Sequence, residues 1–230
     1  MTLKSLIGTP MPNQPPKRRR RKTERPAEII ASALDVFADK GFAAAKLDDI
    51  ARLAGISKGT LYLYFETKEE MFRAVVSTAF AADFEKMDAF ANGFEGPTTQ
   101  LFPIMLSNIA ALSANSRLPA IAKMVIAESR NFPDLARIWH DDIVSRVLDT
   151  LTKLIARGQK RGELVAGDAR LHAFSLVGPM VMALLFREVF ARTASNPPDL
   201  QALALQHSKT IIHGLQGSPT TGTASGRKKT

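Results

Sequence analysis

The chain has 230 residues, 45% of them apolar, which suits one large or two modest domains with a hydrophobic core. It has no cysteine, which excludes a disulfide-stapled fold and a thiolate metal site and fits a reducing compartment. The formal net charge is +9, but residues 1–26 carry +7 and residues 227–229 carry +3, so residues 27–226 carry about −1. The basic residues therefore lie at the two ends of the chain.

These two ends, residues 1–23 and 217–230, are rich in Pro, Gly, Ser and Thr, which predicts a disordered basic arm and a disordered tail. The first residues form no apolar stretch of the signal-peptide type. The longest uncharged helical run, Ala173 to Phe186, is shorter than the roughly 20 residues that a bilayer requires. We therefore expect a cytoplasmic protein without a membrane partner.

Two helices are predicted directly after the arm. Apolar residues from Ile29 to Ala38 form a helical stripe, and Gly41 ends it as a C-cap would. A second, short helix begins near Leu47 and stops at Gly55. Both helices therefore end at a glycine.

Two more helices follow that glycine. Ser57 has a side-chain oxygen that can cap a third helix, whose buried side carries Leu61 and Phe65. The sequence from Thr67 to Glu70 is a capping box that opens a fourth helix. The second and third helices, at about residues 47–66, predict a helix-turn-helix motif.

Only helical patterns follow the linker signal at residues 92–99, and none indicates a strand. Pro103 and Pro179 lie inside these patterns, so we expect a kink or a shifted helix boundary at each. The sequence thus predicts an all-α fold, in which a fourth helix joins an N-terminal helix-turn-helix domain to a C-terminal helical domain. The five C-terminal helices are expected at 98–114, 117–130, 134–160, 168–193 and 199–214.

The third helix has the side chains of a surface that contacts nucleic acid. Gly59 and Thr60 lie nearly opposite its buried side, and Tyr62 and Tyr64 lie on the flanks. A glycine costs about 1 kcal/mol inside a helix relative to alanine, and close approach of the backbone to DNA would explain it. Lys58 and Lys68 would supply cations, and the first turn of the fourth helix offers N–H groups to a phosphate.

The segment from Phe37 to Phe72, FADKGFAAAKLDDIARLAGISKGTLYLYFETKEEMF, resembles the DNA-binding domain of the TetR/AcrR family of bacterial transcriptional regulators. The resemblance covers about residues 24–84. It implies an all-helical homodimer with a variable C-terminal ligand domain. It also implies a DNA-binding domain at 24–88 and a ligand-binding and dimerisation domain at 89–216. Transferred by position, the candidate DNA contacts are Ser57, Lys58, Gly59, Thr60, Tyr62, Tyr64 and Lys68.

Position 46 departs from the family pattern, which usually has Ser or Thr at positions 45 and 46. The cap of the second helix is therefore missing, at a cost of about 0.5–2 kcal/mol for this type of change. Lys46 is a candidate phosphate contact in its place, and a solvated lysine is the alternative. The arm adds Arg18, Arg19, Arg20 and Arg21 as candidate contacts to phosphates or the minor groove, and a solvated tail is the alternative.

For the C-terminal half, the resemblance implies that 168–193 and 199–214 form a four-helix bundle with their mates in a homodimer. A buried core helix without dimerisation is the alternative. Paired recognition helices would then read a palindromic operator. The resemblance also implies a small-molecule pocket, and plain core packing is the alternative for each candidate lining residue. These residues are Phe102, Met105, Ile109, Met124, Trp139, His140, Phe174 and Met180.

The resemblance favours a ligand-released repressor, with the ligand being small and lipophilic or aromatic, that associates with the nucleoid when bound to DNA. A DNA-binding regulator or activator without a small-molecule inducer is the alternative, because its residues 24–84 would look the same. The sequence has none of the nucleophile, phosphate-loop or dinucleotide motifs of enzymes. We therefore predict no enzymatic activity, no cofactor and no metal site.

Overall fold

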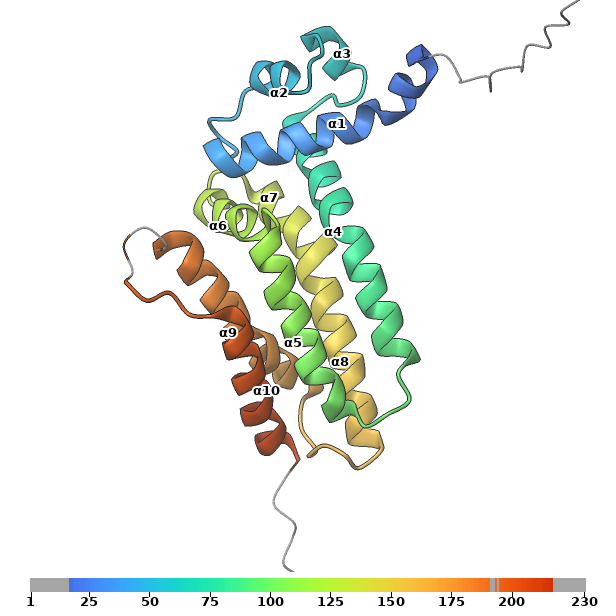
Figure 1. The fold of residues 1–230 in the computed structure, drawn as a ribbon, viewed down its shortest axis with the longest axis vertical. Coiled ribbons are helices and arrows are strands. Elements are labelled where there is room, and N and C mark those ends of the chain that lie inside the picture. Colours follow the sequence, from blue (N-terminus) through green and yellow to red (C-terminus); the bar gives the residue numbers. More distant parts are fainter. Residues whose placement is uncertain (1–16, 191–192, 194, 217–230) are drawn as a thin grey trace, which may run out of the picture.

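The computed structural model describes residues 17–190, 193 and 195–216, and of residues 17–24, 79, 81, 82 and 115 it describes the backbone alone. Four helices form the N-terminal part, at the top of Figure 1. They are α1 (Lys17–Lys40), α2 (Leu47–Leu53), α3 (Lys58–Tyr62) and α4 (Lys68–Gly93). The first helix starts inside the predicted arm and contains Pro26, whereas residues 1–16 lie outside the described residues.

The C-terminal part is also helical, and the described residues contain no strand, so the predicted all-α fold is confirmed. Both α5 and α9 continue through their internal prolines, and neither helix has a boundary there. The single long helix expected at 134–160 is divided by a π-helical turn, η1 (His140–Val144). The other elements are α5 (Thr98–Asn115), α6 (Leu118–Glu128), α7 (Pro133–Trp139), α8 (Ser145–Lys160), α9 (Ala169–Phe190) and α10 (Leu200–Leu215).

One of two hydrophobic clusters lies beneath the helix-turn-helix. At its centre the rings of Phe37, Phe42 and Phe72 lie 5.5–6.0 Å apart and are fully buried. The cluster also contains residues of α6 and α7, among them Ile121 and Leu135, from beyond the predicted boundary at residue 88. The helices α6 and α7 therefore belong to the core on which the N-terminal helices rest.

The second cluster holds α5, α8, α9 and α10 together. It includes Phe102 on α5, Leu151 on α8 and Met180 on α9, all of them almost completely buried. In Figure 1, α4 lies on the opposite side of this bundle from α9 and α10, with α5 and α8 between them. The bundle therefore has two outer sides, one along α4 and one along α9 and α10.

By length and composition, α9 is the one helix among the described residues that could cross a membrane. It is 22 residues long, and thus longer than the uncharged run Ala173–Phe186 within it. One face of α9 packs in the second cluster through Ala173, Leu176 and Met180, whereas the opposite face exposes Phe174 and Met182. This helix is therefore a core element with a second apolar face that the described residues leave uncovered.

The first residue of α5, Thr98, is hydrogen-bonded to Glu163. Its carboxylate accepts a hydrogen bond of 2.6 Å from the backbone N–H of Thr98, and this bond holds the pKa of Glu163 below its usual range. A lowered pKa means that the carboxylate stabilises the fold at neutral pH and that this contribution disappears as the pH falls through the folded-state pKa. We expect Glu163→Gln to lose about 1–3 kcal/mol of unfolding free energy at pH 7.

Denaturant titrations of Glu163→Gln and the parent chain at several pH values check this. The difference between them should close at acidic pH, where both side chains are neutral. Glu95→Gln is the matched control, because Glu95 is exposed and lies in the connection between α4 and α5, shortly before Thr98. A difference that persists unchanged into acid would contradict the role of the Glu163 charge.

Candidate nucleic-acid interface

The start of α3 is fixed by local hydrogen bonds that its sequence predicts. Ser57 has an extended backbone, and its Oγ accepts a hydrogen bond of 3.1 Å from the N–H of Thr60. Gly55 has a φ of +64°, a conformation that other residues rarely adopt, and it allows the sharp turn from α2 into α3. Leu61 and Phe65 are buried, as predicted, so the opposite side of α3 faces outward.

The outward surface of α2 and α3 carries most of the candidate contacts. Lys46, Ser57, Lys58, Gly59 and Tyr62 are exposed, whereas Thr60 and Tyr64 are half-buried. The ring of Tyr64 packs against the first hydrophobic cluster, so its hydroxyl is the part left for a partner. Lys46 precedes α2 and makes no side-chain cap there, in agreement with the missing cap expected from its sequence.

Leu63 is a surface residue that the sequence reasoning did not select. It follows α3 directly, and its side chain is 84% exposed. At this exposure its side chain buries little apolar area, so it contributes little hydrophobic stabilisation. The signal available in the sequence was its position between the two tyrosines, on neither of the faces that bury Leu61 and Phe65.

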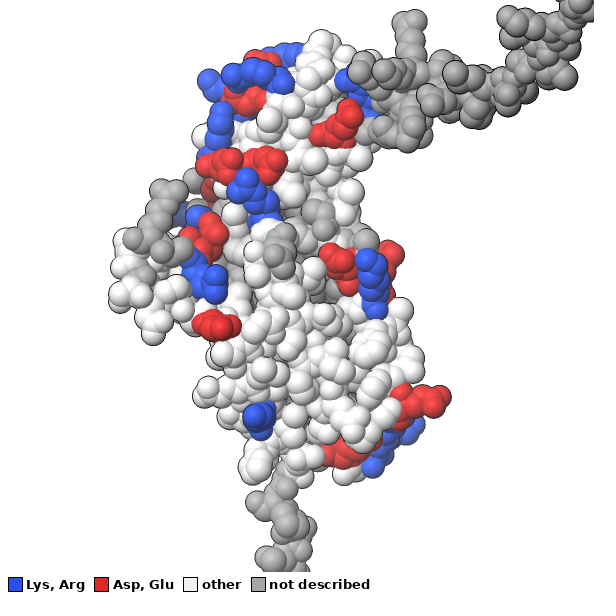
Figure 2. All heavy atoms as spheres, viewed as in Figure 1, with Lys and Arg blue, Asp and Glu red and all other residues white. Residues whose placement is uncertain are grey.

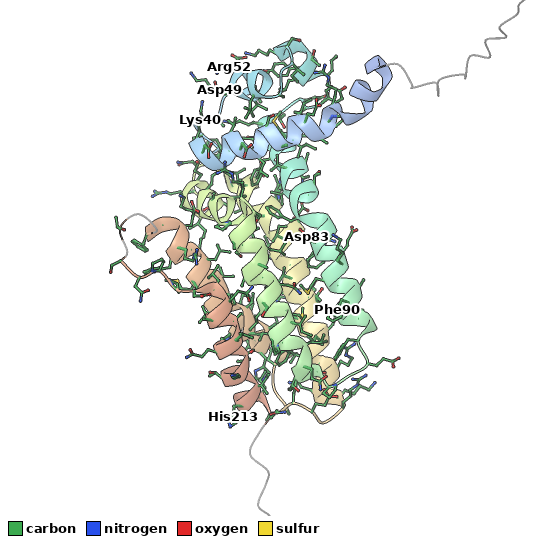
Figure 3. All side chains as sticks on the ribbon, in the orientation of Figure 1. Lys40, Asp49, Arg52, Asp83, Phe90 and His213 are labelled. Carbon is green, nitrogen blue, oxygen red and sulfur yellow. The ribbon has the colours of Figure 1, made fainter. Side chains whose placement is uncertain are left out.

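The acidic residues of the motif are paired with nearby cations. Lys58 Nζ donates a hydrogen bond of 3.2 Å to Oδ2 of Asp48, and this bond is the main cause of the raised pKa of the lysine. Asp49 accepts a bond of 2.7 Å from Lys40 and pairs with Arg52, and the bond from Lys40 is the main cause of its lowered pKa. Figure 3 shows the side chains of Lys40, Asp49 and Arg52 together beside α2.

Residues 27–70 contain eight acidic and five basic residues. Unpaired carboxylates would repel a polyanionic partner, so the pairing of Asp48 and Asp49 with cations reduces this repulsion. Arg117, which precedes α6, adds a cation from outside the motif and binds Asp35 and Asp39 of α1 at 3.2 and 3.1 Å. On the face in Figure 2, basic and acidic side chains accordingly lie next to one another over the motif. The surface is therefore mixed in charge, and at Lys58 the carboxylate of Asp48 would compete with a phosphate for the ammonium.

Lys68 is the candidate whose surroundings differ most from the expectation. Its ammonium donates to the carbonyl oxygens of Phe42, Ala43 and Ala45 at 2.6, 3.4 and 3.2 Å. It also lies 4.5 Å from the centre of the Phe42 ring. A lysine has three N–H donors, so these carbonyls use all of them. Lys68 therefore ties the start of α4 to the connection between α1 and α2.

We expect Lys68→Met to lower the unfolding free energy by about 1.5–3 kcal/mol, because charge-assisted hydrogen bonds are lost while the side-chain length is kept. Denaturant titration measures this, with Lys153→Met on the exposed side of α8 as the control. Equal stability of Lys68→Met and the parent, together with weakened DNA binding, would assign Lys68 to phosphate contact instead.

The start of α4 completes the frame of the motif. Thr67 Oγ1 accepts a hydrogen bond of 3.0 Å from the N–H of Glu70, as the capping box predicts. In the reciprocal bond, the carboxylate of Glu70 accepts from the N–H of Glu66 at 2.9 Å. In the standard box it would accept from the N-cap residue, one position later. The acid of the box therefore also fixes the chain that leaves α3.

The eight candidate pocket residues are not brought together around one cavity. Met124 packs in the first cluster and Trp139 against it, whereas Phe102, Met105 and Met180 are buried in the second cluster. Ile109 packs against the second cluster. Phe174 is 50% exposed on the outer face of α9, beside Arg170. His140 is exposed in η1 and bonds Asp141 at 2.9 Å.

A cavity of about 300 Å³ opens elsewhere, between α4 and α5. Met87 and Phe90 of α4 and Ile104 and Leu112 of α5 give it apolar walls. The candidate pocket residues predicted from the sequence all come from the helices expected at 98–114, 117–130, 134–160 and 168–193, and none comes from α4. The signal in the sequence was the pair of apolar residues Met87 and Phe90, which lie on α4 beyond the part of that helix that packs in the first hydrophobic cluster.

Comparison with known proteins agrees with this geometry. Residues 29–75 match the family model of bacterial regulatory proteins of the tetR family, and residues 103–195 match the tetracyclin repressor-like C-terminal domain. The transcriptional regulator RutR of Escherichia coli K12 is 25% identical over 191 residues, which are 81% of this chain and 82% of RutR. The fatty acid metabolism regulator protein of Bacillus subtilis 168 is 26% identical over 153 residues, which are 65% of this chain and 77% of that protein.

Solved structures share the fold. FadR from Bacillus subtilis, in complex with stearoyl-CoA, has a TM-score of 0.68 at 21% identity, and the match covers 82% of this chain and 98% of the FadR chain. The two family models match successive parts of the chain, one over the helix-turn-helix and one over the helical bundle. The chain therefore belongs to the TetR family of bacterial transcriptional regulators.

Proposed function

We propose that this chain is a cytoplasmic, homodimeric repressor that binds a palindromic operator and leaves it when a small lipophilic or aromatic ligand binds. The observation that carries the proposal is the exposed, Ser57-capped helix α3, with Lys58, Gly59 and Tyr62 on its outer side. A helix presented in this way fits the major groove of DNA. Residues 24–88 are the DNA-binding domain in this proposal, and residues 89–216 are the ligand-binding and dimerisation domain.

The uncovered face of α9 and α10 supports the dimer. It carries large apolar side chains that are 43–63% exposed, including Phe174, Val181 and Met182 on α9 and Leu205 on α10. Apolar area of this kind favours a partner surface over water. A second copy of the chain, related by a two-fold axis, would supply the same face in return. Paired α3 helices would then contact two operator half-sites.

Ligand release is supported by what related proteins are named for. One relative regulates fatty acid metabolism, and the FadR structure holds stearoyl-CoA. The packing of α6 and α7 in the first hydrophobic cluster connects the C-terminal part directly to the core beneath the helix-turn-helix. A ligand can change DNA binding through these contacts if it binds the released and operator-bound states with unequal affinity.

The test uses the chain's own operator, found by selection from random DNA and labelled with a fluorophore. Anisotropy then reports the bound fraction while a library of lipophilic and aromatic compounds is added. A compound that releases the DNA and raises the Tm of the free protein supports the proposal. Binding that no compound alters would favour a regulator or activator without an inducer.

The basic arm gives a separate prediction. Arg18–Arg21, whose side chains lie outside the described part, are proposed to contact phosphates or the adjacent minor groove. Deleting residues 1–22 should weaken operator binding and reduce the slope of log affinity against log salt by about 0.9 for each lost phosphate contact. Affinity titrations between low and physiological salt measure the slope. An unchanged slope would assign the arm to solvent.

A further inference from the structure

The cavity between α4 and α5 is formed by regular stripes on the two helices. On α4, Asp83, Lys86, Met87 and Phe90 follow the i, i+3, i+4, i+7 spacing of one helical face. On α5, Ile104, Asn108 and Leu112 recur every four residues. The α4 helix packs mainly against α1, α7 and α8, and α5 mainly against α10, which leaves the two facing stripes apart. The cavity is therefore a groove along two helices.

A second space of about 310 Å³ continues this groove toward the end of α5. The two spaces share Asp83, Asn108 and Leu112, and the second reaches Ser116. Small-molecule sites commonly begin at volumes of about 300 Å³ and have mostly apolar walls with a few polar groups. The groove thus has the size and the lining of such a site.

The polar groups of the groove indicate the charge of its occupant. Asp83 and Lys86 are the two charged residues that line it, and they lie 3.6 Å apart, so their charges cancel. The amide nitrogen of Asn108 donates to the sulfur of Met87, at 3.8 Å, and a thioether is a weak acceptor. A ligand oxygen would be a stronger acceptor for that N–H donor.

The walls indicate the shape of the occupant. Phe90 is 44% exposed and Ile104 is 40% exposed, on opposite sides of the groove. Phe90 also lies 6.0 Å from the ring of Phe94, so the aromatic wall is extended. Aromatic and methionine side chains pack well against a flat ring. Figure 3 shows Asp83 and Phe90 spaced along the same helix, α4.

We infer that this groove binds a neutral, ring-containing lipophilic molecule with one hydrogen-bond acceptor, and that this molecule is the effector. The second part rests on the proposed function. The same α4 helix carries Phe72, Val75 and Val76 into the core beneath the helix-turn-helix, where all three are fully buried. A molecule that separates α4 from α5 therefore acts on the helix that supports α3.

The binding test uses the full chain and the neutral probe 6-propionyl-2-(dimethylamino)naphthalene, which has a fused ring system, one ketone oxygen and an emission that shifts to the blue in apolar sites. We expect saturable binding of one probe per chain. Filling the groove by Ile104→Trp should lower the affinity at least ten-fold, and Asn108→Ala should lower it about three- to ten-fold. Asn108→Trp is a second groove-filling variant, should Ile104→Trp fold poorly.

Ile126→Trp on α6 is the control, because Ile126 is also exposed but lies outside the groove. It should bind the probe within two-fold of the parent. Unchanged binding by both groove-filling variants would overturn the site. Tighter binding at the groove of the anionic probe 1-anilinonaphthalene-8-sulfonate would overturn the neutral class of ligand.

Operator release is measured separately by anisotropy, so that this inference and the proposed function can fail independently. Loss of release by inducing compounds in Ile104→Trp, with normal operator binding, supports the groove as the effector site. Normal release in that variant would overturn the groove as the effector site and leave the ligand-released repressor intact. If no compound releases the operator from any variant, the proposed function and the effector role fail together, while probe titration still decides the site.

Discussion

Gly59→Ala is expected to weaken operator binding by at least about ten-fold without destabilising the protein. The structure leaves a Cβ at this position free, since only the Ser57 hydroxyl lies near it, at 3.9 Å. The backbone at Gly59 also lacks the positive φ that favours glycine. Alanine is the better helix former by about 1 kcal/mol, so the free protein should gain stability. A loss of affinity then reports contact between this backbone and DNA.

Gly93→Ala is the control, because Gly93 is likewise helical, lies at the far end of α4, and has nothing within 4 Å of an added Cβ. Denaturant titration and operator anisotropy are measured on both variants. If Gly59→Ala bound the operator as tightly as the parent, the outer side of α3 would not approach DNA closely, and the assignment of this surface would be wrong.

Met182→Glu is expected to separate the proposed dimer and to lower operator affinity by at least about 100-fold. Met182 is 63% exposed on α9, so a glutamate there is solvated and harmless in a single chain. In a two-fold dimer through α9 and α10, two carboxylates would be buried at an apolar interface, at a cost of several kcal/mol for each. Sedimentation velocity gives the mass in solution, and anisotropy gives the affinity.

Ile126→Glu is the control, because Ile126 on α6 is also 63% exposed and lies outside the proposed interface. It should leave mass and affinity unchanged. A Met182→Glu protein that keeps the mass of a dimer would exclude this face as the interface. One that becomes a monomer yet binds its operator normally would contradict the need for paired α3 helices.

The elements that local chemistry determines could be predicted from the sequence. The Ser57 and Thr67 caps depend on side chains and N–H groups within three residues, so pattern alone is enough to place them. The helices of the C-terminal part were likewise predicted to within a few residues, because their apolar spacing is regular. The π-helical turn at His140–Val144 gives no such pattern, and the sequence predicted an uninterrupted helix there.

Contacts between distant residues could not be predicted in this way. The carboxylate of Glu128, at the end of α6, accepts bonds from the N–H groups of Phe42 and Ala43 at 2.9 and 2.6 Å, across more than 80 residues of sequence. A Cβ at Gly41 would lie 2.5 Å from the same carboxylate. Sequence identified Gly41 as a C-cap, but the approach of Glu128 depends on how α6 packs below α1.

The candidate DNA contacts and the pocket show the same difference between features set by local sequence and features set by contacts between distant residues. Helical periodicity predicts Gly59 and Thr60 opposite the buried side of α3 and Tyr62 on a flank, and in the structure Gly59 and Tyr62 are exposed whereas Thr60 is half-buried. The role of Lys68 depends on three carbonyls that belong to another segment. The groove exists because α4 and α5 pack mainly against other helices. Composition alone does not show whether the apolar residues of a helix face are buried or line an open groove.

The measurement that tests the central assignment most directly is selection of bound sequences from random double-stranded DNA by the full chain. The chain is expected to enrich a two-fold symmetric sequence, with half-sites centred about 34–36 Å apart or at a multiple of that distance. The Gly59→Ala protein should enrich it poorly in the same selection. Recovery of DNA without any shared sequence, or of a motif that Gly59→Ala enriches equally well, would contradict the assignment of α3 as the helix that reads DNA.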